Sequence, residues 1–203
     1  MVSFPAIHAC AKSYDRGYGC YMHEVQVSVL CGLLFDELHP LFPAYTSEER
    51  DVLICAGLLH DIGTSRGAQK HHKSSYELIL LEGARENDFC FSPEFLEIMA
   101  LIARYHRKAV PRLSHRAYAD LSSGAQEIVR RLSAVLRIAD GLDYMHDQSI
   151  TAITCMREGN RIRCVCVGTD SWSVMRNMDR AREKAEPFSE EFQIGFSLEA
   201  GLK

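Results

Sequence analysis

Two His-Asp pairs in the chain could set an imidazole and a carboxylate side by side. His60 and Asp61 follow the apolar run Val52–Leu59, at what we expect to be the end of a helix. Two adjacent polar side chains are costly to bury there unless a partner satisfies them. His146 and Asp147 instead lie in a polar stretch, which is typical of a turn exposed to solvent. We therefore expect chemistry at the first pair and none at the second.

A divalent cation is the natural partner for the first pair. Neutral imidazole and carboxylate groups are preferred ligands of Zn, Fe, Mn and related ions, and one ion can draw ligands from several helices of a bundle. His23 and Asp140 are further candidates, because each lies on the apolar stripe of a predicted helix. Taken singly, each could be a hydrogen-bonded core residue or a helix cap. Together with His60 and Asp61 they predict a metal site.

Predicted helices must bring these residues together, because they lie far apart in the chain. Apolar residues at helical spacing predict five helices in the first two thirds of the sequence. Thr46 and Glu49 form a capping-box pattern at the start of the second helix, and Ser92 marks the start of the fourth. Gly63 and Gly83 are expected to end the second and third. The expected helical ranges are 21–38, 46–63, 73–81, 93–106 and 125–143, with a loop over 111–123.

The apolar pattern changes after Asp147 from helical spacing to alternation, which predicts strands. Two alternating segments flank Glu158-Gly159-Asn160, a sequence typical of a hairpin turn. The expected ranges are 150–156 and 162–167 for the hairpin, 174–186 for a charged helix stopped by Pro187, and 192–198 for a last strand. We therefore predict a mainly α fold. A helical domain at residues 1–147 would carry a small antiparallel β-β-α-β appendage at residues 148–203.

Length and composition exclude several classes of protein. A chain of 203 residues can build one full core with a small appendage. Its net charge of −4 gives no basic footprint, so no DNA partner is expected. The sequence shows neither a membrane span nor a signal peptide, so we expect a cytoplasmic protein. Its 8 cysteines are expected to be mostly buried apolar residues, with a metal site at Cys155, Cys164 and Cys166 as the less favoured alternative.

The motifs together resemble those of a known family. His23, the segment Leu58–Gly63 and Asp140 follow the order His, His-Asp, Asp of the HD superfamily of metal-dependent phosphohydrolases. Residues 71–79 and 102–108 further resemble the C-terminal HD-like domain of the exopolyphosphatase and guanosine pentaphosphate phosphatase (Ppx/GppA) family. The resemblance covers nearly the whole chain. It implies an HD-domain helical bundle with phosphohydrolase activity.

The resemblance also implies a pair of divalent ions, drawn from Mn, Fe, Mg, Zn and Co. Such a pair would activate water for in-line attack on a phosphoryl group, and Asp61, the expected catalytic carboxylate, would bridge the two ions. His72 and His106 would hold the second ion, with His71 as either an alternative ligand to His72 or a hydrogen-bond donor behind it. The full set of expected metal ligands is His23, His60, Asp61, His72, His106 and Asp140.

Basic residues next to these ligands are expected to bind substrate. Lys73, Arg107 and Lys108 could bind phosphate oxygens, and Lys73 and Arg107 could also take part in catalysis. An equally weighted alternative is that Arg107 and Lys108 lie at a solvated helix end, where cations favour the negative pole of the helix dipole. The expected partner is a small phosphorylated molecule, either a nucleotide or a polyphosphate. A homodimer is left open.

Two functions follow from the resemblance. The full-length family begins with an actin-like pair of ATPase-fold domains that performs the phosphatase reaction, and this sequence contains no glycine-rich phosphate loop of that kind. The intact set of metal ligands nevertheless favours a stand-alone hydrolase that cleaves a phosphoester or phosphoanhydride bond. The alternative is a non-catalytic module that binds polyphosphate or nucleotide, or that mediates dimerisation.

Overall fold

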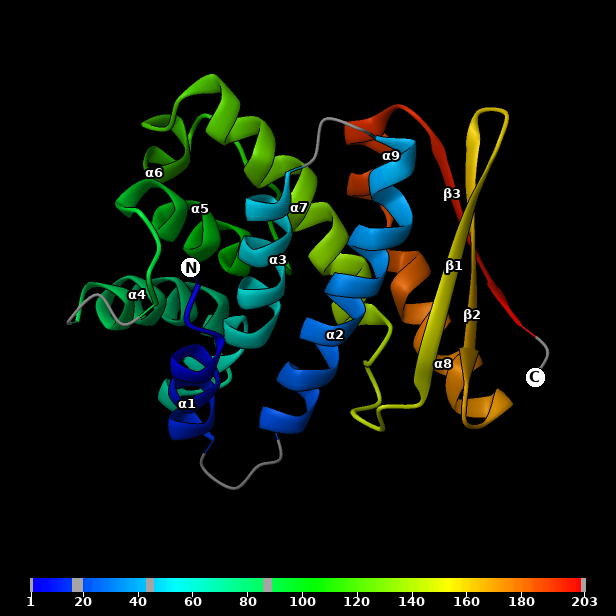
Figure 1. Ribbon diagram of the computed structural model, residues 1–203, viewed down its shortest axis with the longest axis horizontal. Coiled ribbons are helices and arrows are strands. Elements are labelled where there is room, and N and C mark those ends of the chain that lie inside the picture. The colour runs from blue at the N-terminus through cyan, green and yellow to red at the C-terminus, as the bar shows by residue number, and fades with distance from the viewer. Residues whose placement is uncertain (1, 16–19, 43–45, 86–88, 202–203) are drawn as a thin grey trace.

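A computed structural model describes residues 2–15, 20–42, 46–85 and 89–201, and most of them are helical (Figure 1). The α-helices are α1 (Phe4–Tyr14), α2 (Cys20–Leu38), α3 (Ser47–Leu59), α4 (His71–Ala84), α5 (Pro93–Arg104), α6 (Arg116–Ala119), α7 (Ser123–Gly141), α8 (Ser171–Lys184) and α9 (Glu186–Phe192). The 3-10 helices are η1 (His39–Leu41) and η2 (Ile62–Arg66). The strands are β1 (Ile150–Glu158), β2 (Arg161–Gly168) and β3 (Gly195–Ala200). The predicted fold class, mainly α with a small sheet at the C-terminal end, is confirmed.

Local capping signals fix where several helices begin. The Thr46 hydroxyl accepts a hydrogen bond from the backbone N–H of Glu49, whose carboxylate accepts one from the Thr46 N–H. Ser92 caps α5 by accepting from the N–H of Phe95, and Asp170 caps α8 in the same way. These side chains satisfy backbone N–H groups that the first turn of a helix leaves unpaired. The predicted starts of α3 and α5 are therefore confirmed.

The hydrophobic core lies between α2, α3, α5 and α7, which pack on one another. Val27, Leu30 and Leu34 form the predicted stripe of α2 and are completely buried. His23 lies on the same stripe and is only 1% exposed. The prediction that this stripe faces inward is confirmed. This stripe therefore places His23 in the centre of the helical body.

A mixed three-stranded sheet in the order β1-β2-β3 stands at one end of the molecule (Figure 1). β1 and β2 form the predicted antiparallel hairpin, with Gly159 at a positive φ of 60° in its turn. β3 runs parallel to β2, with Gly195 opposite Arg161, so the prediction of an all-antiparallel sheet is wrong at this strand. The reason is that α8 and α9 return the chain to the end of the sheet where β2 began. Such a helical crossover is what a parallel pair needs.

Several element boundaries differ from those predicted. α4 begins two residues before the expected Lys73, and Gly83 lies inside it because the missing side chain makes room for Leu96. α3 ends at Leu59 rather than at Gly63. Pro187 follows the end of α8 as expected but also opens α9, where a proline fits the first turn. α1 and α6 have no counterpart among the predicted elements.

Cys155 and Cys164 lie opposite each other in the hairpin and form a disulfide. Both are buried, as expected for most of the cysteines. The bond between them was not expected, and it forms because the antiparallel register brings their sulfur atoms into bonding range. Cys166 is buried and free, as predicted. Because Cys155 and Cys164 are bonded to each other, they cannot bind a metal as thiolates, and the alternative of a metal site at Cys155, Cys164 and Cys166 is wrong.

The appendage packs directly on the helical body through α8, which contacts α7. A Cβ atom on Gly141 of α7 would lie 2.5 Å from the Cα of Ala181 on α8, so the two backbones approach as closely as a glycine allows. Asn177, also on α8, is fully buried and bonds the turn after α7. The division into two domains between residues 147 and 148 stays a prediction.

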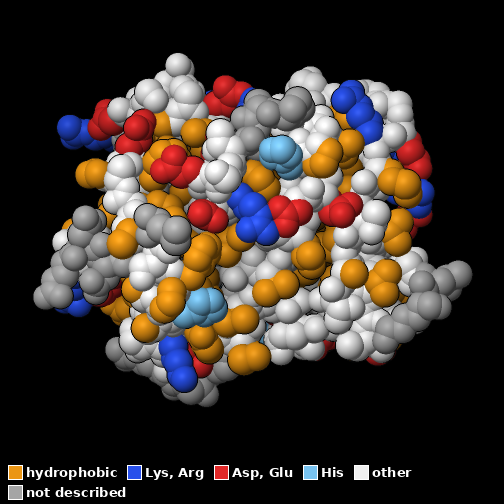
Figure 2. Space-filling model, in the orientation of Figure 1, with side chains coloured by type: hydrophobic (Ala, Val, Ile, Leu, Met, Phe, Trp, Pro, Cys, Tyr) orange, Lys and Arg blue, Asp and Glu red, His pale blue; other side chains and the backbone are white. Residues whose placement is uncertain are grey.

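The face of the molecule in Figure 2 carries hydrophobic side chains together with acidic and basic ones. Charged side chains of both signs are interspersed across this face. Among the described helices, none combines the length and the apolar character needed to cross a bilayer.

Candidate metal centre

Side chains from five helical elements converge at one point inside the body. α2 carries His23, α4 carries His71 and α7 carries Asp140, while His60 follows directly on α3 and His106 follows the end of α5. With Asp61, the four histidines form two overlapping groups of potential ligand atoms, and within each group these atoms lie within 4.8 Å of one another. The first group is His23, His60 and Asp61, and the second is Asp61, His71 and His106. Asp140 belongs to neither group, but its Oδ1 lies 3.5 Å from His23 Nε2 and 3.8 Å from His60 Nε2.

Asp61 belongs to both groups, and its Oδ1 atom is their common point. This atom lies 3.1 Å from His71 Nε2, 3.5 Å from His106 Nε2 and 3.8 Å from His60 Nε2. Ligands that bind one ion at about 2.1 Å lie roughly 3 to 3.5 Å from each other in common coordination geometries. The spacing around Asp61 therefore suits shared coordination of cations with little rearrangement.

Backbone hydrogen bonds orient three of the histidine rings in the same way. The Nδ1 atoms of His60, His71 and His106 lie 2.6, 3.0 and 2.7 Å from the carbonyl oxygen three residues earlier in the chain. A carbonyl oxygen can only accept, so each Nδ1 must carry the proton and donate it. In the neutral ring the Nε2 atom then offers a lone pair toward Asp61. Metal-binding histidines are commonly held by such a hydrogen bond from their other nitrogen.

His23 is held by carboxylates instead. Its Nδ1 lies 2.8 Å from Asp143 Oδ2, and its Nε2 lies 3.5 Å from Asp140 Oδ1. Burial lowers the pKa of His23, but hydrogen bonds to Asp140 and Asp143 and the charges of Asp140 and Asp61 outweigh it and raise the pKa to about 10. Asp143 is fully buried and completes a carboxylate–histidine pair of the kind found behind metal ligands. It is a site residue that the sequence did not reveal.

Two atoms at the centre have no hydrogen-bond partner among the described residues, namely His60 Nε2 and Asp61 Oδ1, and both are buried. Leaving a buried polar atom unsatisfied costs about 1–3 kcal/mol, and more for a charged group. When the His71 proton is on Nδ1, a lone pair of His71 Nε2 also faces a lone pair of Asp61 Oδ1 at 3.1 Å, which is repulsive. A proton or a metal cation must therefore lie between these atoms.

The pKa values of Asp61 and His106 suit a cation, whereas the raised pKa of His23 means that a metal bound there would have to displace its second proton. Burial raises the pKa of Asp61, but the surrounding histidines, His60 first, lower it well below its usual range. Burial, helped by the charge of His60, lowers the pKa of His106 to about 3. Asp61 is therefore a carboxylate and His106 a neutral imidazole, the forms that bind metal. The residues present fit divalent ions on this ground.

His72 and Lys73 lie outside both ligand groups, although the His72 ring centre is 6.5 Å from that of His106, so their expected roles stay predictions. Neighbouring residues of a helix point in different directions, so with His71 turned toward Asp61, His72 cannot face it as well. His72 and Lys73 line a separate hollow on the other side of Arg107. Of the two histidines the structure brings His71 into the cluster.

The cluster opens into a pocket of about 370 Å³. Arg107 lies on its wall, with Nη1 3.1 Å from His71 Nε2, and Lys108 lines it as well. The opposite wall comes from α8, which contributes Arg180, Glu183 and Lys184. The Lys184 ammonium group bonds the Asp140 carboxylate. The segment Glu183-Lys184-Ala185 is part of the resemblance to the Ppx/GppA family, but the sequence motifs indicated no role in the site for Arg180, Glu183 and Lys184.

His146 touches the site, although the second His-Asp pair was expected to be an uninvolved turn. Both residues of this pair are exposed, as predicted. The His146 ring stacks on His23 with the ring centres 3.9 Å apart, and it lines the same pocket. Asp147 points elsewhere and accepts hydrogen bonds from the Ser149 backbone and the Asn177 side chain.

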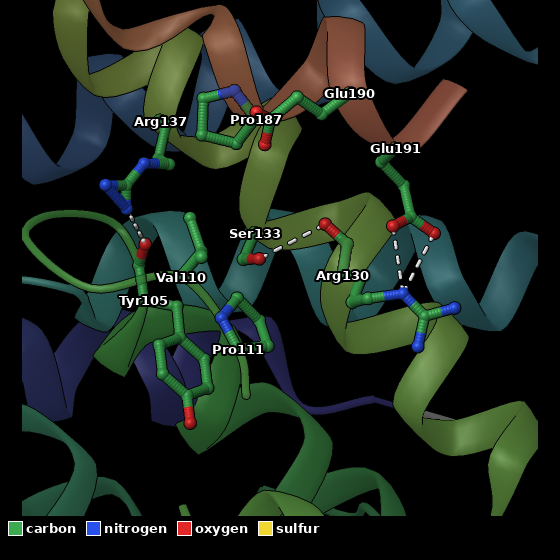
Figure 3. A pocket seen from close by; sticks show the side chains of 9 residues that line it. All are labelled: Tyr105, Val110, Pro111, Arg130, Ser133, Arg137, Pro187, Glu190 and Glu191. Atoms are coloured by element: carbon green, nitrogen blue, oxygen red, sulfur yellow. Dashed lines mark hydrogen bonds and ion pairs between the residues drawn. The ribbon is translucent and has the colours of Figure 1, made fainter. Parts of the chain in front are cut away.

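A second cavity, of about 210 Å³, lies behind the loop that carries Arg107 and Lys108 (Figure 3). Arg137 reaches across from α7 and donates hydrogen bonds to the carbonyl oxygens of Tyr105 and Lys108, both at 2.7 Å. Burial lowers the pKa of this guanidinium. Val110, Pro111 and Pro187 make much of the wall apolar. We therefore infer that this region supports the loop after α5 and takes no part in the chemistry.

Comparison with known protein families gives one match. Residues 20–178 match a family model described as Ppx/GppA phosphatase, domain III. The matched range contains every residue of the two ligand groups, and it ends within α8 before Arg180. No curated protein sequence matches the chain.

Proposed function

Because the chain belongs to the Ppx/GppA phosphatase domain III family, we propose that it is a metal-dependent phosphohydrolase of the HD superfamily. It hydrolyses a phosphoester or phosphoanhydride bond in a small phosphorylated molecule, such as a nucleotide or a polyphosphate. In this proposal the residues of this chain carry out the hydrolysis themselves.

One observation carries the proposal. Three histidines are held by backbone carbonyls so that their Nε2 atoms face a buried carboxylate, and two of the central atoms have no protein partner. A core histidine that serves only packing has both nitrogens satisfied by its neighbours. An arrangement that leaves lone pairs facing one point favours metal binding.

The residues have separate tasks in this mechanism. Divalent ions bound here supply water acidic enough to lose a proton near neutral pH, and they offset negative charge on the phosphoryl group. Asp61 holds the centre together because it belongs to both ligand groups. His23, His60 and Asp140 complete one side of the centre, and His71 and His106 the other.

Basic side chains on the pocket wall bind the substrate. Arg107 and Lys108 approach from the loop after α5, and Lys184 approaches from α8. Their charges lie beside the cluster, so they can hold phosphate oxygens while the water attacks. Lys73 lies outside this pocket, and we leave it out of the phosphate-binding set.

The test is a measurement of bound metal together with a survey of substrates. Protein freed of metal is reloaded with Mn²⁺, Mg²⁺, Fe²⁺, Co²⁺ or Zn²⁺, and bound metal is counted by elemental analysis. Each form is then assayed on bis-p-nitrophenyl phosphate, p-nitrophenyl phosphate, nucleotides and inorganic tripolyphosphate. We expect two equivalents of metal and hydrolysis of at least one class.

A binding or dimerisation module is the alternative, and the same experiment separates the two. A protein that binds metal and a nucleotide or tripolyphosphate but hydrolyses no phosphoester would contradict the enzymatic proposal. A protein that binds no metal would contradict the metal centre as well.

A further inference from the structure

The metal pocket continues along α8 into a second hollow. This outer hollow has a volume of about 290 Å³ and shares Tyr144, Arg180 and Glu183 with the metal pocket. Arg176 and Asp179 complete its lining. A substrate whose reacting phosphate lies beside the metal cluster therefore has room to extend along α8.

An exposed aromatic ring stands at the junction of the two hollows. Tyr144 is 44% exposed, although a large ring of this kind is more often covered. The guanidinium carbon of Arg180 lies 4.4 Å from the centre of the Tyr144 ring, and Arg180 Nη2 donates a hydrogen bond to the Tyr144 hydroxyl. Glu183 holds the same guanidinium at 2.5 Å. The ring is thus fixed in place while much of it stays accessible.

The charges of the two hollows differ. In the inner pocket the carboxylates of Asp61 and Asp140 belong to the metal centre, and Arg107 and Lys108 are left for a phosphate group, while Arg180 and Glu183 line both hollows. In the outer hollow two acidic residues, Asp179 and Glu183, accompany two arginines. Each further phosphate of an inorganic chain would bring negative charge beside these carboxylates. A neutral group that can stack on an aromatic ring and form hydrogen bonds fits the outer hollow better.

We infer that Tyr144 and Arg180 form a subsite for the non-phosphate part of the substrate, which makes the substrate a nucleoside phosphate rather than an inorganic phosphate chain. This inference rests on the proposed function for the position of the reacting phosphate. Arg180 lies beyond residues 20–178, so membership of the family does not predict its role. Stacking on an aromatic side chain is tolerant of which base is bound. The subsite therefore selects a nucleoside without fixing its base.

Binding of non-hydrolysable probes tests the subsite without relying on activity. The first probe is a phosphonate analogue of adenosine monophosphate, with a methylene group in place of the ester oxygen. Methylphosphonate has the same head group without the nucleoside, and methylenediphosphonate mimics a phosphate chain. Dissociation constants are measured by calorimetry on the protein as purified. We expect the nucleoside probe to bind at least tenfold more tightly than either of the others.

Variants of Tyr144 identify the contact. Tyr144→Ala should weaken the nucleoside probe about tenfold, because a stacked base contributes on the order of 1–3 kcal/mol, and should leave methylphosphonate unchanged. Tyr144→Phe keeps the ring and should retain most of the affinity. Trp172→Ala is the control: Trp172 in α8 is also an exposed aromatic residue, and although Arg176 of the outer hollow lies over its ring, Trp172 itself lines neither hollow. It should bind all three probes as the wild type does.

The outcomes separate this inference from the proposed function. Equal binding of the nucleoside probe by wild type and Tyr144→Ala overturns the subsite, as does tighter binding of methylenediphosphonate. If the protein still hydrolyses bis-p-nitrophenyl phosphate, the subsite is wrong but the proposed enzymatic function is supported. Nucleoside binding that depends on Tyr144, in a protein that hydrolyses no phosphoester, supports the subsite and contradicts the proposed function.

Discussion

Two histidines of the centre cap a helix with one ring nitrogen and face the cluster with the other. The last turn of a helix leaves carbonyl groups unpaired. His60 and His106 come directly after the last turns of α3 and α5, and each donates Nδ1–H to a carbonyl of that turn. The same bond that completes the helix end fixes the ring. Turning either ring away from Asp61 would break this hydrogen bond.

The carboxylate of Asp61 is the side chain on which the centre depends most. Asp61→Asn keeps the shape but removes the charge that offsets the cations. We expect lower metal content and at least about a hundredfold slower hydrolysis, since even changes behind metal ligands approach that size. Elemental analysis and the phosphoester assay measure both effects.

Asp147→Asn is the control for this change. Asp147 accepts from the Ser149 N–H and the Asn177 side chain through Oδ1, and an amide oxygen can keep these two bonds, so stability should change by roughly half a kcal/mol. If Asp147→Asn abolished activity while Asp61→Asn preserved it, the metal centre would have been assigned to the wrong His-Asp pair.

Adjacent histidines on α4 provide a sharper comparison. His71 lies 3.1 Å from Asp61, whereas His72 lines a different hollow. His71→Ala should therefore lower bound metal by about one equivalent out of two, and His72→Ala should leave the metal content unchanged. Circular dichroism checks that both variants fold. The opposite pattern of metal loss would restore the ligand set expected from the sequence.

Sequence alone predicts part of the centre because position in a helix pattern is local information. His23 and Asp140 lie on apolar stripes, and His60 follows an apolar run, so their burial could be foreseen. Which of His71 and His72 faces inward depends on how α4 is rotated. That rotation is set by a contact between elements, for which a single sequence gives no direct signal.

Close contacts between helices set this rotation. Gly63 in η2 packs so tightly on the start of α4 that a Cβ atom would lie 2.2 Å from the His71 carbonyl oxygen. The Gly63 N–H also donates to the Ser75 hydroxyl at 2.9 Å. The glycine that the sequence suggests as a helix stop thus serves to position α4. Asp61 and His71 come together because these elements approach without an intervening side chain.

Contact between α7 and α8 depends on a second glycine. In Gly141→Ala the added methyl group would overlap Ala181, which should destabilise the protein by about 1–3 kcal/mol through overpacking. It should also weaken the adenosine phosphonate, because α8 carries Arg180 and Lys184 into the pocket. Urea unfolding and calorimetry measure the two effects.

Gly124→Ala, near the other end of α7, is the matched control. Its added methyl group would meet no atom within 4 Å, and alanine is the better helix former by up to about 1 kcal/mol. Stability should stay equal or rise, and probe binding should be unchanged. Equal losses in both variants would mean that substitution in α7, rather than its contact with α8, causes the effect.

The complete fold joins two parts that the sequence describes separately. Helical spacing and alternation predict the body and the strands. The direction of β3 and the wall that α8 adds to the pocket depend on how the last segments return to the body, and the spacing of apolar residues does not record this. Lys184 shows the consequence, since a residue of the appendage bonds Asp140 of the body. The site is therefore a property of the folded chain as one unit.

Because ligands come from five helical elements, metal should stabilise the whole fold. An ion that binds only the native state at a hundred times its dissociation constant adds about 2.7 kcal/mol. For a chain of this size that corresponds to roughly 5 to 10 °C in Tm. We expect excess EDTA to lower Tm by this amount, and added Mn²⁺ to restore it, in thermal unfolding followed by circular dichroism. In Asp61→Asn the response should be lost, because Asp61 belongs to both ligand groups. An equal response to EDTA in variant and wild type would show that the stabilising metal binds elsewhere.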